Sequence, residues 1–168
     1  NRLDRNTSGI VAAGKTMNGL QKLSAHFKDR TLNKYYICIV KGEITKRQLV
    51  NGYLKKDHSS NRVTIYKQLP DDILSDKNMP ANDKNTDKSE YMPIETEYIP
   101  VVSNGRITLL KIHLITGRSH QIRAHLASLS HPLAGDYKYG DASFNQYFAD
   151  KYFCRNQMLH SYEIDIPD

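Results

Sequence analysis

The sequence predicts an α+β fold, in which a mixed and mainly antiparallel sheet carries helices packed on it. Two turn signals indicate the antiparallel sheet. Asn104-Gly105 separates two β-rich runs, and a polar cluster at residues 58–61 separates two more. Two helices are indicated by apolar residues that recur three and four positions apart within residues 16–27 and 120–129.

The composition bounds the class of protein. The chain has 168 residues, enough for one domain with a hydrophobic core. Its two cysteines cannot form a disulfide framework, so a reducing cytoplasm is expected, and Cys38 lies in an apolar run typical of a core. No apolar run approaches the length of a membrane span, and no signal peptide is visible.

The formal net charge of +6 is unevenly distributed. Residues 71–90 hold six acidic residues and three lysines, net −3, which leaves +9 for the rest of the chain. Charge alone argues only for non-specific attraction. A body this basic nevertheless favours RNA over a neutral small substrate.

The first third of the chain predicts strand, helix, strand. Residues 9–14 are expected to form a short buried strand. Thr16 can cap the helix that follows, whose apolar face is expected to pack on the body. Residues 35–40 are apolar on both faces of a strand, which places them centrally in the sheet, with Tyr36 and Cys38 on one face.

The middle of the chain predicts two hairpins. Residues 51–56 and 62–68 are expected to form the first, and residues 96–102 and 106–115 the second. Between them, residues 70–93 are rich in Asp, Asn, Lys, Ser and Pro without an apolar period. We expect a mobile polar loop insertion there.

The last third predicts two helices and a strand. Ser119 is expected to cap the helix over residues 120–129, whose N-terminus would suit an anion. The aromatic stripe from Phe144 to Tyr152 has nearly helical spacing and is interpreted as core rather than as a base-stacking surface. Residues 158–166 alternate as a final strand.

The chemistry is expected in residues 2–9, which read Arg-Leu-Asp-Arg-Asn-Thr-Ser-Gly. Arg2 and Arg5 would keep Asp4 ionised, because a nearby positive charge favours the charged form. An ionised carboxylate can act as a nucleophile or a base. Alone, such a cluster is more often a set of surface ion pairs that contribute little.

Three further segments change that weighting. Residues 34–42 read K-Y-Y-I-C-I-V-K-G, residues 116–126 read T-G-R-S-H-Q-I-R-A-H-L, and residues 131–136 read H-P-L-A-G-D. Together with residues 2–9, and in this order, they strongly resemble the RluA-type family of RNA pseudouridine synthases. That family carries R-L-D-x-x-T-S-G, K-x-Y-x-x-x-V-x-G, T-G-R-(S/T)-H-Q-(I/L)-R-x-H and H-P-x-x-G-D.

The resemblance implies a pseudouridine synthase catalytic core that isomerises uridine to pseudouridine in structured RNA, with no cofactor and no metal. It implies catalytic roles for Asp4, which acts on the ribose, Tyr36, whose ring stacks on the flipped base, and Arg123, which pairs with Asp4. The residues expected to contact the substrate are Arg2, Arg118, His120, Gln121 and Ile122.

Several alternatives stay open. From pattern alone, Tyr36 is more often a core tyrosine, and whether Asp4 attacks the sugar or abstracts its C2′ proton is undecided. His120 and His125 are five apart rather than the four that sets two metal ligands on one helix face. A non-catalytic RNA-binding module is the rival class, but a pure binder gains nothing from a carboxylate facing phosphates. A nucleoside hydrolase would use that carboxylate but needs no basic body.

Two departures from the family pattern concern the N-terminus. The family usually has His where this chain has Asn1, and an N-K-P-x-G stretch ahead of the aspartate motif is absent. We therefore expect residues 1–168 to be a catalytic domain cut short at its N-terminus. The expected substrate is bacterial 23S ribosomal RNA, favoured over tRNA, bound by a monomer in the cytoplasm away from any membrane.

Overall fold

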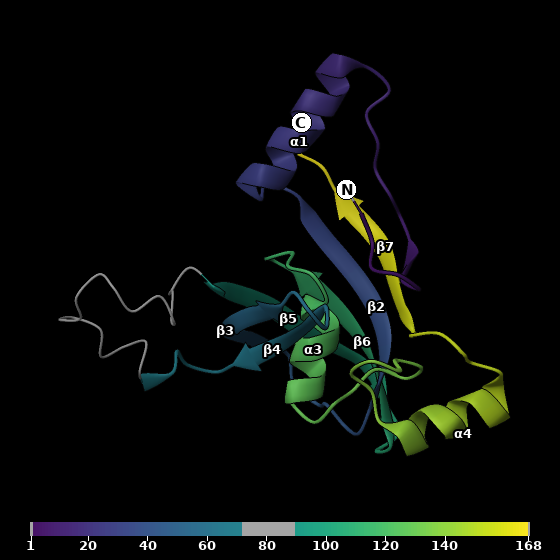
Figure 1. Ribbon diagram of the computed structural model, residues 1–168. Helices are drawn as coiled ribbons and strands as arrows, with labels where there is room; N and C mark the ends of the chain where they lie inside the picture. Colours follow the sequence, from purple (N-terminus) through teal and green to yellow (C-terminus); the bar gives the residue numbers. More distant parts are fainter. Residues whose placement is uncertain (1, 72–89, 168) are drawn as a thin grey trace.

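The computed structural model describes residues 2–71 and 90–167, which form one seven-stranded sheet and three helices (Figure 1). The strands are β1 (Ser8–Gly9), β2 (Asn33–Lys41), β3 (Gln48–Asp57), β4 (Arg62–Tyr66), β5 (Tyr91–Ser103), β6 (Ile107–Leu114) and β7 (Leu159–Asp165). The helices are α1 (Met17–Asp29), α3 (Gln121–Ser128) and α4 (Ala142–Tyr152).

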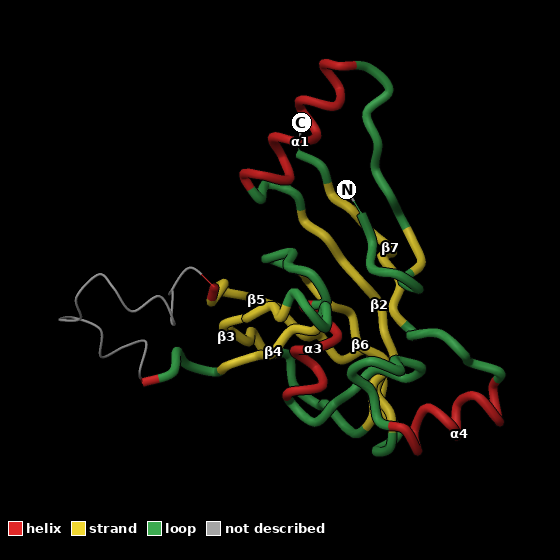
Figure 2. The backbone as a smooth tube through the Cα atoms, viewed as in Figure 1, coloured by secondary structure: helices red, strands yellow, loops and turns green. Residues whose placement is uncertain are grey.

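The sheet has the strand order β1-β7-β2-β6-β5-β3-β4. The pair β1–β7 is parallel, and every other neighbouring pair among the described strands is antiparallel. The predicted α+β class with a mixed, mainly antiparallel sheet is therefore confirmed. Figure 2 shows how long β2 runs through the body, with β7 along one side of it.

Both predicted hairpins are present because their turns use local chemistry. Gly105 has a φ of 81°, and the Asn104 side chain accepts hydrogen bonds from the backbone N–H groups of Arg106 and Ile107. The other turn is fixed by Asp57, whose carboxylate accepts the backbone N–H of Ser59. These contacts set the registers of β5–β6 and β3–β4.

The core lies between the sheet and α3. Cys38 and Val40 on β2 are 2% and 0% exposed, as predicted, and α3 packs Ile122 and Leu126 in the same cluster. Side chains alternate along a strand, so Tyr36 lies on the face that Cys38 and Val40 share. The ring of Tyr36 packs against this core from one side, where the site described below opens.

The N-terminal region differs from its prediction. Instead of a buried strand over residues 9–14, only Ser8–Gly9 pairs in the sheet, and Ile10 and Val11 are exposed. Helix α1 starts where predicted, with the Thr16 hydroxyl accepting the Gly19 N–H, but it buries no residue completely. In its apolar stripe Leu20 is about half exposed, whereas Leu23 and Phe27 are partly buried.

Two further expectations need correction. In α4 only part of the aromatic stripe is core: Phe148 is buried, whereas Tyr147 and Tyr152 are about half exposed. The polar loop was placed over residues 70–93, but β5 begins at Tyr91, which is buried and pairs with Lys55. Most of that expected loop, residues 72–89, lies outside the described residues.

Candidate active site

A cleft of about 650 Å³ opens where the N-terminal segment, β2 and the start of α3 meet. It is lined by all eight of the residues predicted to act on or contact a substrate, which are Arg2, Asp4, Tyr36, Arg118, His120, Gln121, Ile122 and Arg123. These residues come from three segments far apart in the sequence. The fold therefore brings together the set that the sequence motifs pointed to.

Asp4 lies in this cleft with its side chain 21% exposed. Its Oδ2 atom is 3.4 Å from the Nη1 atom of Arg123, which lies in the opening turn of α3. The local sequence suggests Arg2 and Arg5 as the charges beside Asp4, whereas the family resemblance implies Arg123 as its partner. Among the described residues Asp4 forms one ion pair, with Arg123. Folding brings this distant arginine to the carboxylate, whereas the arginines next to Asp4 in the sequence form no ion pair with it.

Arg123 is itself held from behind by Asp136. Its Nε and Nη2 atoms donate to the two carboxylate oxygens of Asp136 at 2.8 and 2.9 Å, a bidentate arrangement. Burial opposes both charges, but the pair outweighs it: Asp136 raises the pKa of Arg123, and Arg123 lowers the pKa of Asp136. The guanidinium that reaches Asp4 is thus charged and fixed in one orientation.

Asp136 is a site residue that sequence reasoning missed. It is the last residue of the segment 131–136 and has no role in the sequence analysis, yet it is 1% exposed and anchors the loop after it by accepting the N–H groups of Lys138 and Tyr139. Asn145 on α4 holds the backbone of the same loop through the Asp136 carbonyl. The His-Pro-Leu-Ala-Gly-Asp motif was the available signal, and a buried acid needs a cationic partner.

Tyr36 enters the cleft from β2, where it pairs with Ile112 on one side and Ser161 on the other. Burial raises the pKa of its phenol, and the negative charge of nearby Asp4 raises it further. The phenol therefore stays neutral at physiological pH. It can offer a ring face and a hydroxyl beside Asp4, but it does not act as a phenolate base.

Gln121 shapes the start of α3. Its side-chain oxygen accepts from the Thr116 hydroxyl and the Arg118 N–H, and its nitrogen donates to the Glu95 carbonyl and the Thr96 hydroxyl. These four bonds use the full capacity of the amide. Gln121 therefore positions the turn before the helix, and the predicted cap by Ser119 is wrong.

His120 occupies the N-cap position instead, with a φ of 56° and no side-chain cap bond. Its Nδ1 atom is 2.9 Å from the hydroxyl of Tyr139, and that hydroxyl also accepts the Val63 N–H. The Tyr139 ring lies under the guanidinium of Arg123 at 5.2 Å from its centroid. Tyr139, which sequence reasoning also missed, thus links the helix start to the buried arginine.

The segment that carries Asp4 is tied to the end of the chain. The Thr7 hydroxyl accepts from Gln157 at 2.6 Å, the Ser8 hydroxyl is 2.8 Å from His160 Nδ1, and the Ile10 N–H donates to the Ser161 carbonyl. Two of these partners lie in β7 and one just before it, and together they hold the short strand β1 in register. They fix the backbone three to six residues from the carboxylate.

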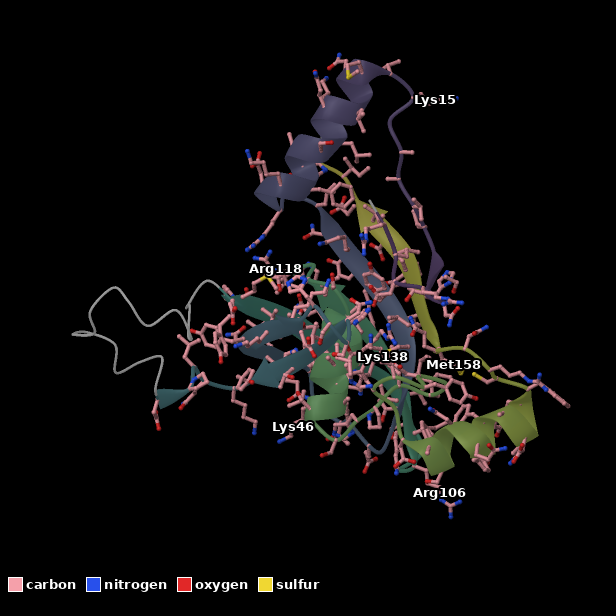
Figure 3. The ribbon with its side chains drawn as sticks, in the orientation of Figure 1. Lys15, Lys46, Arg106, Arg118, Lys138 and Met158 are labelled. Atoms are coloured by element: carbon pink, nitrogen blue, oxygen red, sulfur yellow. The ribbon has the colours of Figure 1, made fainter. Side chains whose placement is uncertain are left out.

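The cleft is strongly basic. Its lining includes six lysine and arginine side chains, which are Arg2, Lys28, Arg30, Lys34, Arg118 and Arg123, and one carboxylate, that of Asp4. Of these six, only Arg123 forms an ion pair with an acidic side chain in the described residues. Figure 3 shows Arg118 near the centre of the molecule and Lys15 far from it, on the loop before α1.

The histidines do not gather. His125 is buried against Tyr98, with ring centroids 5.7 Å apart, and His131 lies beside the backbone carbonyl of Lys41. Within residues 2–71 and 90–167, no three His, Cys, Asp or Glu side chains lie close enough to share a metal ion. The helices in this part of the chain are also too short or too polar to cross a membrane.

We compared the chain with known protein families. Residues 1–128 match the family model described as RNA pseudouridylate synthase. The chain belongs to this family. The match includes the segments that supply Asp4, Tyr36 and Arg123, so the resemblance seen in the motifs is confirmed.

Relatives of the chain include RNA pseudouridine synthases that are named for different RNAs. An uncharacterized RNA pseudouridine synthase of Mycoplasma genitalium is 36% identical over 99% of the chain, and ribosomal large subunit pseudouridine synthase C of Vibrio vulnificus is 34% identical over 88%. A tRNA pseudouridine synthase C of Salmonella typhi is 29% identical over 98%. The chain spans only 46%, 40% and 60% of these three proteins.

The fold also matches a solved structure. Human RNA Pseudouridylate Synthase Domain Containing 1 superposes with a TM-score of 0.73, at 22% identity, over 99% of this chain and 62% of that one. At this identity the likeness concerns the fold alone. It supports the pseudouridine synthase core that the motifs implied.

Proposed function

We propose that this protein isomerises uridine to pseudouridine in a structured RNA, with Asp4 as the catalytic carboxylate. The observation that carries the proposal is the ordered chain of charges in the cleft. Asp136 holds Arg123 by two hydrogen bonds, and Arg123 reaches Asp4 at 3.4 Å beside the ring of Tyr36. A carboxylate oriented in this way is prepared for a reaction at one atom.

The reaction breaks the N1–C1′ bond, turns the uracil, and joins C5 to C1′. Breaking a glycosidic bond develops positive charge on the sugar, which a nearby carboxylate stabilises or attacks. Asp4 would do this, either as a nucleophile at C1′ or as the base that removes the C2′ proton. The isomerisation needs no redox step and no net hydrolysis, so the proposal includes no cofactor and no metal.

The target nucleotide has to leave its helix to reach the cleft. Flipping a base out of a duplex costs a few kcal/mol. We assign Tyr36 to stack on the flipped uracil, which returns about 1–3 kcal/mol. Ile122 would form the floor of the base pocket, and Arg2 would fill the gap that the flipped nucleotide leaves.

The substrate we favour is large-subunit ribosomal RNA, with tRNA as the alternative. The basic lining of the cleft suits either polyanion. Relatives with ribosomal names are 30–34% identical to the chain, compared with 29% for those named for tRNA, and this small margin supports the preference. We further propose that the protein acts as a monomer in the cytoplasm.

The decisive experiment replaces Asp4 by Asn in the full-length protein. Pseudouridine formation in the target RNA should fall by at least about a thousandfold, because the amide can neither attack the sugar nor take a proton. RNA affinity should change little. Turnover like that of the wild type would refute the role of Asp4.

The control is Asp29→Asn, because Asp29 is exposed at the end of α1 and does not line the cleft. It should leave turnover unchanged. A wild-type protein that binds RNA but forms no pseudouridine in ribosomal RNA or tRNA would favour the rival class, a non-catalytic RNA-binding module. Release of free uracil would instead indicate a hydrolase.

A further inference from the structure

Two cations of the cleft, Lys34 and Arg118, are partly buried, and neither forms an ion pair with a carboxylate of the described residues. The Nε atom of Arg118 is inaccessible to solvent and has no hydrogen-bond partner within the described part of the chain. The side chain of Lys34 is partly buried, and among residues 2–71 and 90–167 no carboxylate forms an ion pair with it. A buried charge is costly unless it is paired, so such a group is expected to meet an anion from outside.

The geometry places these cations together. Lys34 lies on β2 two residues before Tyr36, so both side chains project from the same face of the sheet into the cleft. A side chain at Gly117 would put its first carbon 3.0 Å from the Lys34 ammonium. The ammonium therefore lies against the backbone just before Arg118. Arg30 lines the same part of the cleft.

The electrostatics of Lys34 agree with an unfilled anion site. Burial lowers its pKa below the ordinary value, and the positive charge of Arg30 lowers it further. Both effects make the protonated amine less favourable in the free protein. An anion between these side chains would reverse the second effect and return a strong charge-assisted hydrogen bond.

We propose that Lys34 and Arg118, with Arg30 beside them, bind one phosphodiester group of the RNA backbone next to the target uridine. The proposal rests on the proposed function, because it assumes that the flipped nucleotide enters this cleft. The phosphate would fix the nucleotide on the side of the cleft where β6 ends and α3 begins. The Asp4–Arg123 pair would then meet the ribose, and Tyr36 the base.

The test is a double-mutant cycle between the protein and the RNA. An RNA oligonucleotide carrying the target uridine is compared with two oligonucleotides that have a neutral methylphosphonate at the linkage before or after that uridine. Binding is measured in the full-length Asp4→Asn protein, so the substrate is not consumed. Lys34→Met is then added, with Lys34→Arg as the variant that keeps the charge.

Lys34→Met should weaken binding of the natural RNA by about tenfold, as expected for a lost charge-assisted contact. One of the two methylphosphonates should weaken binding by a similar factor, and the two changes together should cost little more than either alone. The slope of log K against log salt should become shallower by about 0.7–0.9, one phosphate contact. Lys34→Arg should recover most of the affinity.

Lys46→Met is the matched control, because Lys46 is exposed on the loop beyond the other end of β2 (Figure 3). It should leave both affinity and salt slope unchanged. Additive losses at both linkages, or inorganic phosphate that binds without any coupling to a methylphosphonate, would overturn the subsite. A thermal melt of each variant separates lost binding from lost folding.

The two proposals can fail separately. If the wild-type protein forms pseudouridine but shows no coupling with Lys34, the subsite is wrong and the proposed function stands. If coupling is present but no RNA yields pseudouridine, the phosphate subsite stands as part of an RNA-binding cleft. The binding assay and the turnover assay therefore report on different claims.

Discussion

Arg123 and Arg118 lie five residues apart and line the same cleft, yet their guanidinium groups are in opposite situations. Arg123 donates to both oxygens of Asp136 and reaches Asp4. Arg118 has a buried Nε atom with no hydrogen-bond partner among residues 2–71 and 90–167. The difference shows how one cleft divides its positive charges. The guanidinium paired within the protein points toward Asp4, and the one whose Nε atom is unpaired in the described residues is the one we propose for the substrate.

The substitution Asp136→Asn breaks the ion pair that holds Arg123. The change leaves Arg123 buried with its main counter-ion gone, and breaking a buried ion pair in this way typically costs about 3–5 kcal/mol. We expect the free energy of unfolding, measured in urea, to fall by that amount. Pseudouridine formation should also fall, because the bidentate contact that orients the guanidinium toward Asp4 is lost.

Asp141→Asn is the matched control, because Asp141 forms an ion pair with Lys41 at the surface. Asn also remains a good N-cap for α4, where Asp141 accepts the Phe144 N–H. The loss should stay below about 1 kcal/mol. An equal loss in the two variants would contradict the claim that Asp136 is the anchor of the site.

A third situation sharpens the comparison: an ionisable group that is buried and kept neutral. Burial lowers the pKa of His125 from 6.5 to about 4. Below pH 6.5 the unfolded chain takes up a proton that the folded state excludes. Stability from this residue is therefore complete above pH 6.5 and lost as the pH falls toward 4, by about 1.4 kcal/mol per unit and roughly 3 kcal/mol in all.

Denaturant unfolding at pH values between 7 and 4 measures this slope. His125→Asn serves as the reference, since an amide does not titrate and its oxygen can replace Nδ1 beside the Thr96 hydroxyl. The variant should lose the pH dependence even if its absolute stability is lower. An unchanged slope between pH 6.5 and 4 would mean that His125 is accessible to protons in the folded state.

The smallest effect on stability is expected at Tyr139, whose ring packs against the guanidinium of Arg123. Tyr139→Phe keeps the ring under Arg123 but removes the hydroxyl that accepts the Val63 N–H. An amide left unpaired costs about 1–3 kcal/mol, and here a value near the lower end is expected because Val63 lies next to an exposed turn. Thermal unfolding measures the loss, and Tyr139→Leu, which also removes the ring, should lose more.

Most of the fold could be predicted because its signals are local. The Asn104-Gly105 turn fixes one hairpin through bonds within three residues, and Thr16 caps α1 in the same way. The errors arose where distant residues decide. Ser119 looks like a helix cap, but the Gln121 amide, bonded to Glu95 and Thr96, already shapes that turn.

The site divides along the same line. All eight residues that the motifs pointed to line the cleft, because each motif is short and continuous in the sequence. They did not identify Asp136 and Tyr139 as supports of Arg123, because those contacts exist only after α3 and the following loop have packed together. For the same reason the local sequence alone pointed to Arg2 and Arg5 beside Asp4, and only the family resemblance implied Arg123. The unpaired Nε atom of Arg118 within the described residues had no signal in the sequence.

The position of β7 has a consequence for the order of events during synthesis. This last strand lies between β1 and β2, and its neighbourhood supplies the bonds from Gln157, His160 and Ser161 that hold the residues after Asp4. The carboxylate is made first but can be seated only after residue 161 has left the ribosome. A nascent chain that stops before this point contains Tyr36 and Arg123 but lacks the β7 residues that bond the backbone after Asp4, so we expect it to form no pseudouridine.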